Sequence, residues 1–128
     1  IWPGLVGSEM CIRDRNLGCQ PGLVLNPDIS LNVLEPYLED IYMVLLMSVF
    51  PGFGGQKFIP EVLDKVKNLR QQIDEKNLEV RLEIDGGVNS ENISDISSAG
   101  ADTFVAGSAI FNNKNYSNAI KNLRDNFY

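Results

Sequence analysis

Three glycine-rich segments hold the residues of this 128-residue chain that are best suited to chemistry. The first, Pro51–Gln56, reads Pro-Gly-Phe-Gly-Gly-Gln, and the other two are Asp85–Val88 and Gly107–Ser108. Glycine has no side chain, so backbone N–H groups in such loops can approach an anion closely. These amides need no net positive charge to hold a phosphate group. The three segments together predict a phosphate site.

Asp85 is the candidate acid, base or metal ligand. It ends an apolar run at two glycines, and a carboxylate at the carboxyl end of a barrel strand is well placed for such work. The alternative is a helix N-cap or a turn carboxylate, and we favour the functional interpretation. By alternation Glu83 shares the face of Asp85, where it either orients Asp85 or takes part in a structural ion pair, while Leu82 and Ile84 lie on the other face.

Two side chains near the glycine-rich segments have two open interpretations each. Met47 shares one face of its predicted strand with Met43 and Leu45, and it either walls the site or fills the core. Gln56 either binds the substrate or caps the following helix.

The composition removes several classes of site. The chain has no histidine, which excludes Ser-His-Asp and Cys-His nucleophile systems and histidine-based zinc sites. Carboxylates are then the acid–base groups that remain. The 17 acidic residues outnumber the 11 basic ones, giving a net charge of −6. A nucleic-acid groove needs clustered Lys and Arg, so no nucleic-acid partner is expected.

Three further features concern where the protein works. Cys11 and Cys19 are too few for a disulfide framework and predict free thiols in a reducing compartment. No apolar run is long enough to predict a membrane span. No segment has the layout of a secretory signal peptide. We therefore expect a cytoplasmic protein with no membrane partner.

Four short apolar runs, each followed by turn residues, predict buried strands. They are Gly22–Asn26, Met43–Val49, Val80–Asp85 and Thr103–Gly107. Apolar residues at helical spacing predict three helices. These are Val62–Ile73 with Pro60 in its first turn, Ser90–Ser98 with Asn89 or Ser90 as N-cap and Gly100 as its end, and Tyr116–Phe127. We expect Pro36 to break Leu31–Leu38 into two short turns.

Alternating strands and helices predict an α/β fold with a parallel sheet and helices outside it. The carboxyl ends of parallel strands meet at one edge, so the three glycine-rich segments should lie side by side there. The chain is long enough for one domain but has about half the ~250 residues of a full (β/α)8 barrel. Residues 1–15 show no period, and we interpret them as an irregular or foreign segment preceding the domain at 16–128.

Several segments resemble those of ribulose-phosphate 3-epimerases. They are Gly22–Pro27, Met47–Phe58, Glu83–Val88, Ala99–Asp102 and Val105–Phe111. The resemblance covers about residues 16–127, and PGFGGQ and DGGV are its most specific parts. It implies the C-terminal half, strands five to eight, of a TIM (β/α)8 barrel of the ribulose-phosphate-binding type. The family is metal-dependent, and a parent enzyme that is a homo-oligomer is expected. It interconverts D-ribulose 5-phosphate and D-xylulose 5-phosphate in the pentose phosphate pathway.

The resemblance assigns substrate-phosphate binding to the three glycine-rich segments. The residues are Gly52, Phe53, Gly54, Gly55, Gly86, Gly87, Gly107 and Ser108. Asp85 matches the family's second catalytic aspartate, which also binds one divalent metal ion, with Zn, Fe, Mn, Co and Mg as candidates. Phe50 departs from the polar residue often found before PGFGG and leaves the phosphate loop intact.

The rest of the family's site has no counterpart in this chain. A further aspartate, two histidine metal ligands and a serine near the substrate are missing. Epimerisation at C3 suits two carboxylates on opposite faces, one acting as base and one as acid. A divalent cation on the C2 and C3 oxygens would stabilise the enediolate. We therefore interpret the chain as a fragment of the enzyme that is incomplete for turnover.

Three alternatives remain. One is an epimerase of another ketose phosphate, such as allulose 6-phosphate, with the same loops. Another is a half-barrel that binds phosphate or self-associates without turnover. Thiamine-phosphate synthase is less favoured, because EIDGGV together with PGFGGQ fits it poorly.

Overall fold

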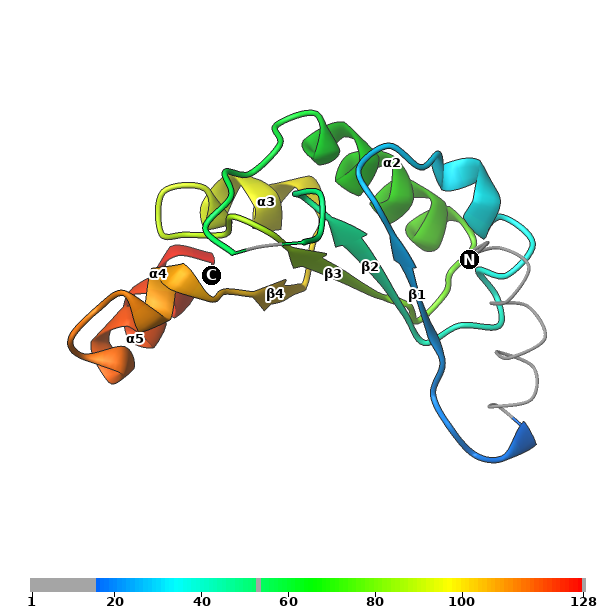
Figure 1. Ribbon diagram of the computed structural model, residues 1–128. Coiled ribbons are helices and arrows are strands. Elements are labelled where there is room, and N and C mark those ends of the chain that lie inside the picture. The colour runs from blue at the N-terminus through cyan, green and yellow to red at the C-terminus, as the bar shows by residue number, and fades with distance from the viewer. Residues whose placement is uncertain (1–15, 53, 128) are drawn as a thin grey trace.

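The computed structural model describes residues 16–52 and 54–127, and a four-stranded parallel sheet lies at the centre of this fold (Figure 1). Its strands are β1 (Gly22–Leu25), β2 (Met43–Met47), β3 (Arg81–Asp85) and β4 (Thr103–Val105), in that spatial order. All four predicted strands are present. The parallel α/β organisation inferred from the sequence is confirmed.

The second and fourth strands end two residues earlier than predicted. Asp85 pairs with both Met47 and Val105, so the ladder on either side of β3 reaches the same level. Directly after Asp85 the chain turns away at Gly86, which has a φ of +132°. Neither neighbouring strand then has a partner on β3 with which to continue its ladder.

One short 3-10 helix and four α-helices accompany the sheet within the described residues. They are η1 (Leu31–Leu34), α2 (Val62–Glu75), α3 (Ile93–Ala99), α4 (Ser108–Phe111) and α5 (Tyr116–Phe127). The predicted stripe on α2, Val62, Val66, Leu69 and Ile73, is fully buried. Pro60 lies before α2, in the turn that leads into the helix, rather than in its first turn. The sequence did not predict α4, which is too short to show a helical period.

The predicted N-cap of α3 was wrong, although its predicted end was right. The helix begins after Asn92, because Asn89 closes a separate turn before it. The Oδ1 atom of Asn89 accepts hydrogen bonds from the N–H groups of Glu91 (2.9 Å) and Asn92 (3.1 Å). Gly100 ends the helix with a φ of +126°, a conformation that favours glycine.

The two faces of the sheet differ as strand alternation predicts. Val44, Leu46, Leu82 and Ile84 are fully buried on the side where α2 and α3 lie (Figure 1). The other side chains of β2 and β3 face away from these helices, and most of them are only half-buried. We call this second surface the inner face. A parallel sheet with helices on one side is the arrangement expected of part of a (β/α) barrel.

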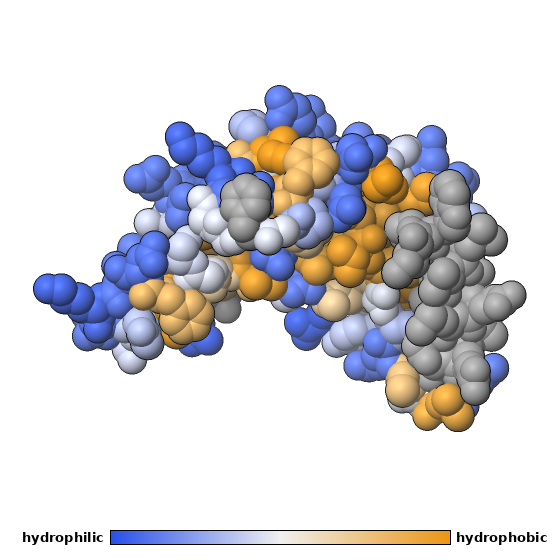
Figure 2. Space-filling model, viewed as in Figure 1, coloured by the Kyte–Doolittle hydropathy of each residue, from blue (hydrophilic) through white to orange (hydrophobic). Residues whose placement is uncertain are grey.

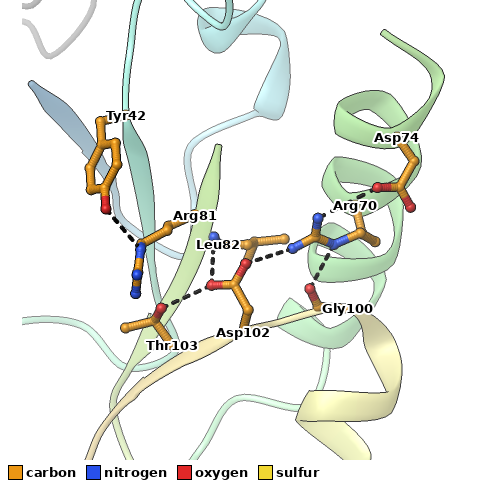
Figure 3. Close-up of polar contacts among 8 residues, drawn as sticks. All are labelled: Tyr42, Arg70, Asp74, Arg81, Leu82, Gly100, Asp102 and Thr103. Atoms are coloured by element: carbon orange, nitrogen blue, oxygen red, sulfur yellow. Dashed lines mark hydrogen bonds and ion pairs between the residues drawn. The ribbon is translucent and has the colours of Figure 1, made fainter. Parts of the chain in front are cut away.

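A polar network ties the elements together at the amino ends of β3 and β4 (Figure 3). From α2, Arg70 donates hydrogen bonds to the carbonyl oxygen of Gly100 (2.8 Å) and to a carboxylate oxygen of Asp102 (2.9 Å). The other carboxylate oxygen of Asp102 accepts from the N–H of Leu82 (3.2 Å) and from the hydroxyl of Thr103 (2.9 Å). One carboxylate thus joins both strands to α2.

Two sequence expectations concern residues outside the fold's core. Cys19 is an exposed free thiol, as expected. Cys11 and the rest of the segment 1–15 lie outside the described residues. Among the described residues, no helix combines the length and apolar character that crossing a bilayer requires.

Candidate active site

The loops that follow β2, β3 and β4 line a single pocket of about 320 Å³. Its lining includes Gly52, Gly54, Gly55, Asp85, Gly86, Gly87, Gly107 and Ser108. These are the predicted substrate-binding and acid–base residues except Phe53, which lies outside the described residues. The convergence that parallel strands predicted is therefore present. We call these three loops the rim.

Buried Ser48, which sequence reasoning did not single out, joins two of the rim loops. Its hydroxyl donates to the carbonyl oxygen of Gly86 at 2.5 Å, and its N–H donates to the carbonyl oxygen of Asp85 at 2.9 Å. A Cβ at position 86 would lie 2.7 Å from a methyl group of Val49 and 2.9 Å from the Ser48 hydroxyl. Close packing therefore requires glycine at position 86. The only sequence signal for Ser48 is a small polar residue at the end of an apolar strand.

Gly87 is also fixed by its surroundings. Its φ is +68°, and a Cβ there would collide with the backbone nitrogen of Phe58. Its carbonyl oxygen accepts a hydrogen bond of 2.9 Å from the side-chain amide of Asn92. Asn92 is thus a second residue that shapes the rim without having been predicted, since its effect depends on the loop geometry.

Other rim glycines face open space. A Cβ at Gly54 or Gly107 would meet nothing within 4 Å, and neither residue has the positive φ that excludes larger residues. Gly52 and Gly55 have positive φ values of +152° and +76°, also with open space around the missing Cβ. The glycines of the first and third loops therefore leave room for a ligand.

Several backbone donors of the rim are unused. Within residues 16–52 and 54–127, no hydrogen bond is donated by the N–H groups of Gly55, Gly87, Gly107 or Ser108. All four residues line the pocket. A phosphate group needs several N–H donors at short range, and loops of this kind supply them.

Asp85 lies half-buried at the carboxyl end of β3, between Met47 of β2 and Val105 of β4 in the ladder. All three residues line the pocket, so Met47 forms part of its wall. Glu83 lies two residues earlier on the same face and makes no ion pair with any described residue. Burial raises the pKa of Glu83, and the negative charges of Asp85 and Asp102 raise it further.

Gln56 has a different role from both interpretations offered by the sequence. Its side-chain amide donates a hydrogen bond of 2.6 Å to the carbonyl oxygen of Phe50, across the base of the first rim loop. It does not cap α2, whose N-cap is Glu61. Gln56 also lines the pocket, and so it stabilises the loop from inside the site.

The residues present do not by themselves fit a divalent metal. Among the described residues, no three His, Cys, Asp or Glu side chains are grouped as metal ligands. Catalytic metal sites use about three protein ligands. Asp85 could supply one, and the remaining ligands would have to come from outside the described part of the chain.

Two other cavities bear on the choice of site. A second cavity of about 480 Å³ adjoins the pocket, sharing Gly55 and Gly87 with it, and is lined by Lys57. The largest cavity, about 730 Å³, lies between η1 and α2. Its basic residue, Lys65, already donates to the carbonyl oxygens of Pro27 (2.5 Å) and Ile29 (2.6 Å). The rim pocket remains the candidate site.

Comparison with known proteins decides the family. A sequence model described as the ribulose-phosphate 3 epimerase family matches residues 7–111. The chain belongs to this family. A ribulose-phosphate 3-epimerase of Escherichia coli (strain K12) is 51% identical over 107 residues, which make up 84% of this chain and 48% of that protein. Ribulose-phosphate 3-epimerase 2 of Cupriavidus necator is 58% identical over 104 residues, covering 78% and 42%.

The chain spans about half the length of the curated relatives that it matches. Solved structures agree on the fold. KGPDC from Streptococcus mutans superposes with a TM-score of 0.62 at 21% identity, covering 91% of this chain and 50% of that one. A structure of the same protein in complex with ribulose 5-phosphate gives 0.63 and covers 52% of that chain. The four strands and their helices thus form part of a (β/α) barrel.

Proposed function

We propose that the whole protein, of which this chain makes up about half, interconverts D-ribulose 5-phosphate and D-xylulose 5-phosphate. The observation that carries the proposal is the convergence of the three rim loops and Asp85 on one pocket. Membership of the ribulose-phosphate 3-epimerase family supports it. This half supplies the phosphate site and one carboxylate.

The substrate phosphate binds against the rim. The N–H groups of Gly55, Gly87, Gly107 and Ser108 are the donors for its oxygens. Lys57 is the only basic residue that lines either rim cavity among the described residues. Recognition therefore depends mainly on backbone donors, which explains how an acidic chain can bind an anion. A structure with this fold in complex with ribulose 5-phosphate supports a sugar phosphate as the ligand class.

Asp85 transfers the proton at C3 on one face of the substrate. Epimerisation removes that proton from one face and returns a proton to the other, so a second acid–base group must face Asp85 across the bound intermediate. Glu83 cannot be that group, because it lies on the same face of β3 as Asp85. The second group comes from outside the described residues. A divalent metal, a cytoplasmic location and a homo-oligomeric parent stay predictions.

The test is to restore the missing half. The 128-residue chain alone should not catalyse exchange of the C3 proton of D-ribulose 5-phosphate above a buffer control. Fused to the N-terminal half of the Escherichia coli relative, it should epimerise this substrate. NMR in deuterated water measures both reactions.

A chain that epimerises by itself would contradict the proposal, as would a folded fusion that binds the substrate without converting it. Turnover of allulose 6-phosphate in preference to D-ribulose 5-phosphate would favour the other ketose-phosphate epimerase. Phosphate binding without any turnover by the fusion would favour a half-barrel that only binds.

A further inference from the structure

The inner face and both sheet edges are uncovered within the described part of the chain. No described strand pairs with the outer edge of β1 or of β4. Unpaired parallel edges present rows of free backbone donors and acceptors, which are templates for pairing with another chain.

The most exposed apolar side chains of this surface lie on the two edge strands. On β1, Val24 is 50% exposed, and on β4, Val105 is 38% exposed. Both point to the inner face, since Val24 pairs with Leu45 and Val105 pairs with Asp85. Figure 2 shows apolar residues gathered in the hollow on this side of the molecule. The surface is apolar where the edges end.

The molecule is also open for its mass. Its accessible surface is 8222 Å², whereas ~6,800 Å² is expected for a compact monomer of 14.2 kDa. The excess, ~1,400 Å², exceeds the ~800 Å² that each partner buries in a standard protein–protein interface. An assembly could therefore cover the excess.

The chain itself has too little left to complete a barrel. Only 15 residues precede the first described residue. One parallel strand already needs a crossover connection of about a dozen residues, and a barrel of eight strands lacks four here. A second copy of the chain carries four such strands with the same twist and direction.

We propose that two copies of this chain close an eight-stranded parallel barrel around a two-fold axis. The β4 edge of each copy pairs with the β1 edge of the other, forming two identical seams. This isologous arrangement saturates both edges, so it ends at the dimer and does not extend into a fibre. The inner faces of the two copies meet in the barrel, and both rims lie at the same end. The proposal does not depend on the catalytic one.

The experiment measures the mass of the 128-residue chain in solution by light scattering and sedimentation. A dimer of twice 14.2 kDa is expected. Val24→Lys and Val105→Glu should each raise the dimer dissociation constant at least tenfold, because each places a charge at both seams. Val33→Lys is the matched control, since Val33 is 38% exposed but lies on η1, away from the inner face. It should leave the dimer unchanged.

Mixing the two edge variants tests the seams themselves. A heterodimer of the Val24→Lys and Val105→Glu chains has one unaltered seam and one seam with opposite charges. Mixing should therefore restore dimers that neither variant forms alone, while circular dichroism shows that both variants keep their secondary structure. A chain that is monomeric at every concentration would overturn the proposal. So would polydisperse aggregates, failure of the mixture to restore dimers, or a dimer that disappears when residues 1–15 are deleted.

Discussion

The two ends of the sheet are built differently. At the amino ends of β3 and β4, Asp102 and Arg70 satisfy each other and the backbone groups around them (Figure 3). At the carboxyl ends, glycines replace side chains and several N–H groups have no partner among the described residues. One end holds the strands in place, and the other leaves donors for a ligand. This division is typical of barrel enzymes, whose chemistry lies at the carboxyl ends.

The largest effect should come from the one carboxylate of the rim that reaches the pocket. In the restored fusion, Asp85→Asn keeps the shape of the side chain but removes its ability to transfer a proton. The rate should fall ~10²-fold or more, the usual contribution of a positioned acid–base group. Steady-state epimerase assays measure it.

The control for this substitution is Asp95→Asn, an exposed position on α3 away from the pocket. It should leave the rate unchanged. A fusion indifferent to Asp85→Asn would move the proton transfer to another residue.

Filling the rim should remove phosphate binding without unfolding the protein. Gly54→Val and Gly107→Val place a side chain where nothing lies within 4 Å, so only a ligand is displaced. Each should weaken binding of D-ribulose 5-phosphate at least tenfold in calorimetric titrations, because the added side chain occupies the space near the N–H donors.

Gly87→Val is the informative comparison, because its side chain would collide with the backbone of Phe58. It should lower the unfolding temperature, whereas Gly54→Val and Gly107→Val should not. Equal affinity in wild type and in both pocket variants would reject the phosphate site.

The amino end should respond in stability and not in binding. Asp102→Ala leaves the N–H of Leu82 and the guanidinium of Arg70 without their shared acceptor. The free energy of unfolding should fall by about 1–2 kcal/mol, since Asp102 is partly exposed and solvent weakens its ion pair. Urea unfolding measures the loss, with exposed Asp125→Ala as control. A weaker affinity for sugar phosphate in Asp102→Ala would break the division between the two ends.

The rim depends on one buried hydroxyl. Ser48→Ala removes the hydrogen bond to the carbonyl oxygen of Gly86 and should cost about 1 kcal/mol of unfolding free energy. Because that bond joins two loops of the pocket, the affinity for sugar phosphate should fall a few-fold as well. A variant that loses stability but keeps full affinity would show that the loops hold their positions without Ser48.

The smallest effect concerns Glu83 and pH. Its pKa is raised in the folded state, chiefly by burial and then by Asp85 and Asp102. The folded protein therefore binds more protons than the unfolded chain above the ordinary carboxyl range, and stability falls as pH rises through that interval. Glu83→Gln should flatten this fall. Urea unfolding at a series of pH values measures it, and parallel curves for wild type and variant would contradict the account.

The sequence predicted those features that depend on local pattern and on strand direction. Alternation placed Glu83 and Asp85 on the face opposite Leu82 and Ile84, and helical spacing identified the buried stripe of α2. Parallel strands required the three glycine loops to meet, and they do.

Features set by contacts between distant residues were missed. Ser48 bonds to a residue 38 positions away, and nothing local distinguishes it from other polar residues at strand ends. The N-cap of α3 was misplaced because Asn89 forms a turn of its own, and both structures use the same residue types. The four residues of α4 are too few to show a period.

The central claim is that the rim binds phosphate while the amino end only supports the fold. Amide NMR of the chain during titration with D-ribulose 5-phosphate tests it most directly. The account predicts that the N–H signals of Gly55, Gly87, Gly107 and Ser108 shift together with one dissociation constant. The signal of Leu82, bonded to Asp102 at the other end, should stay in place. Shifts confined to the amino end, or no shift at any rim amide, would contradict the account.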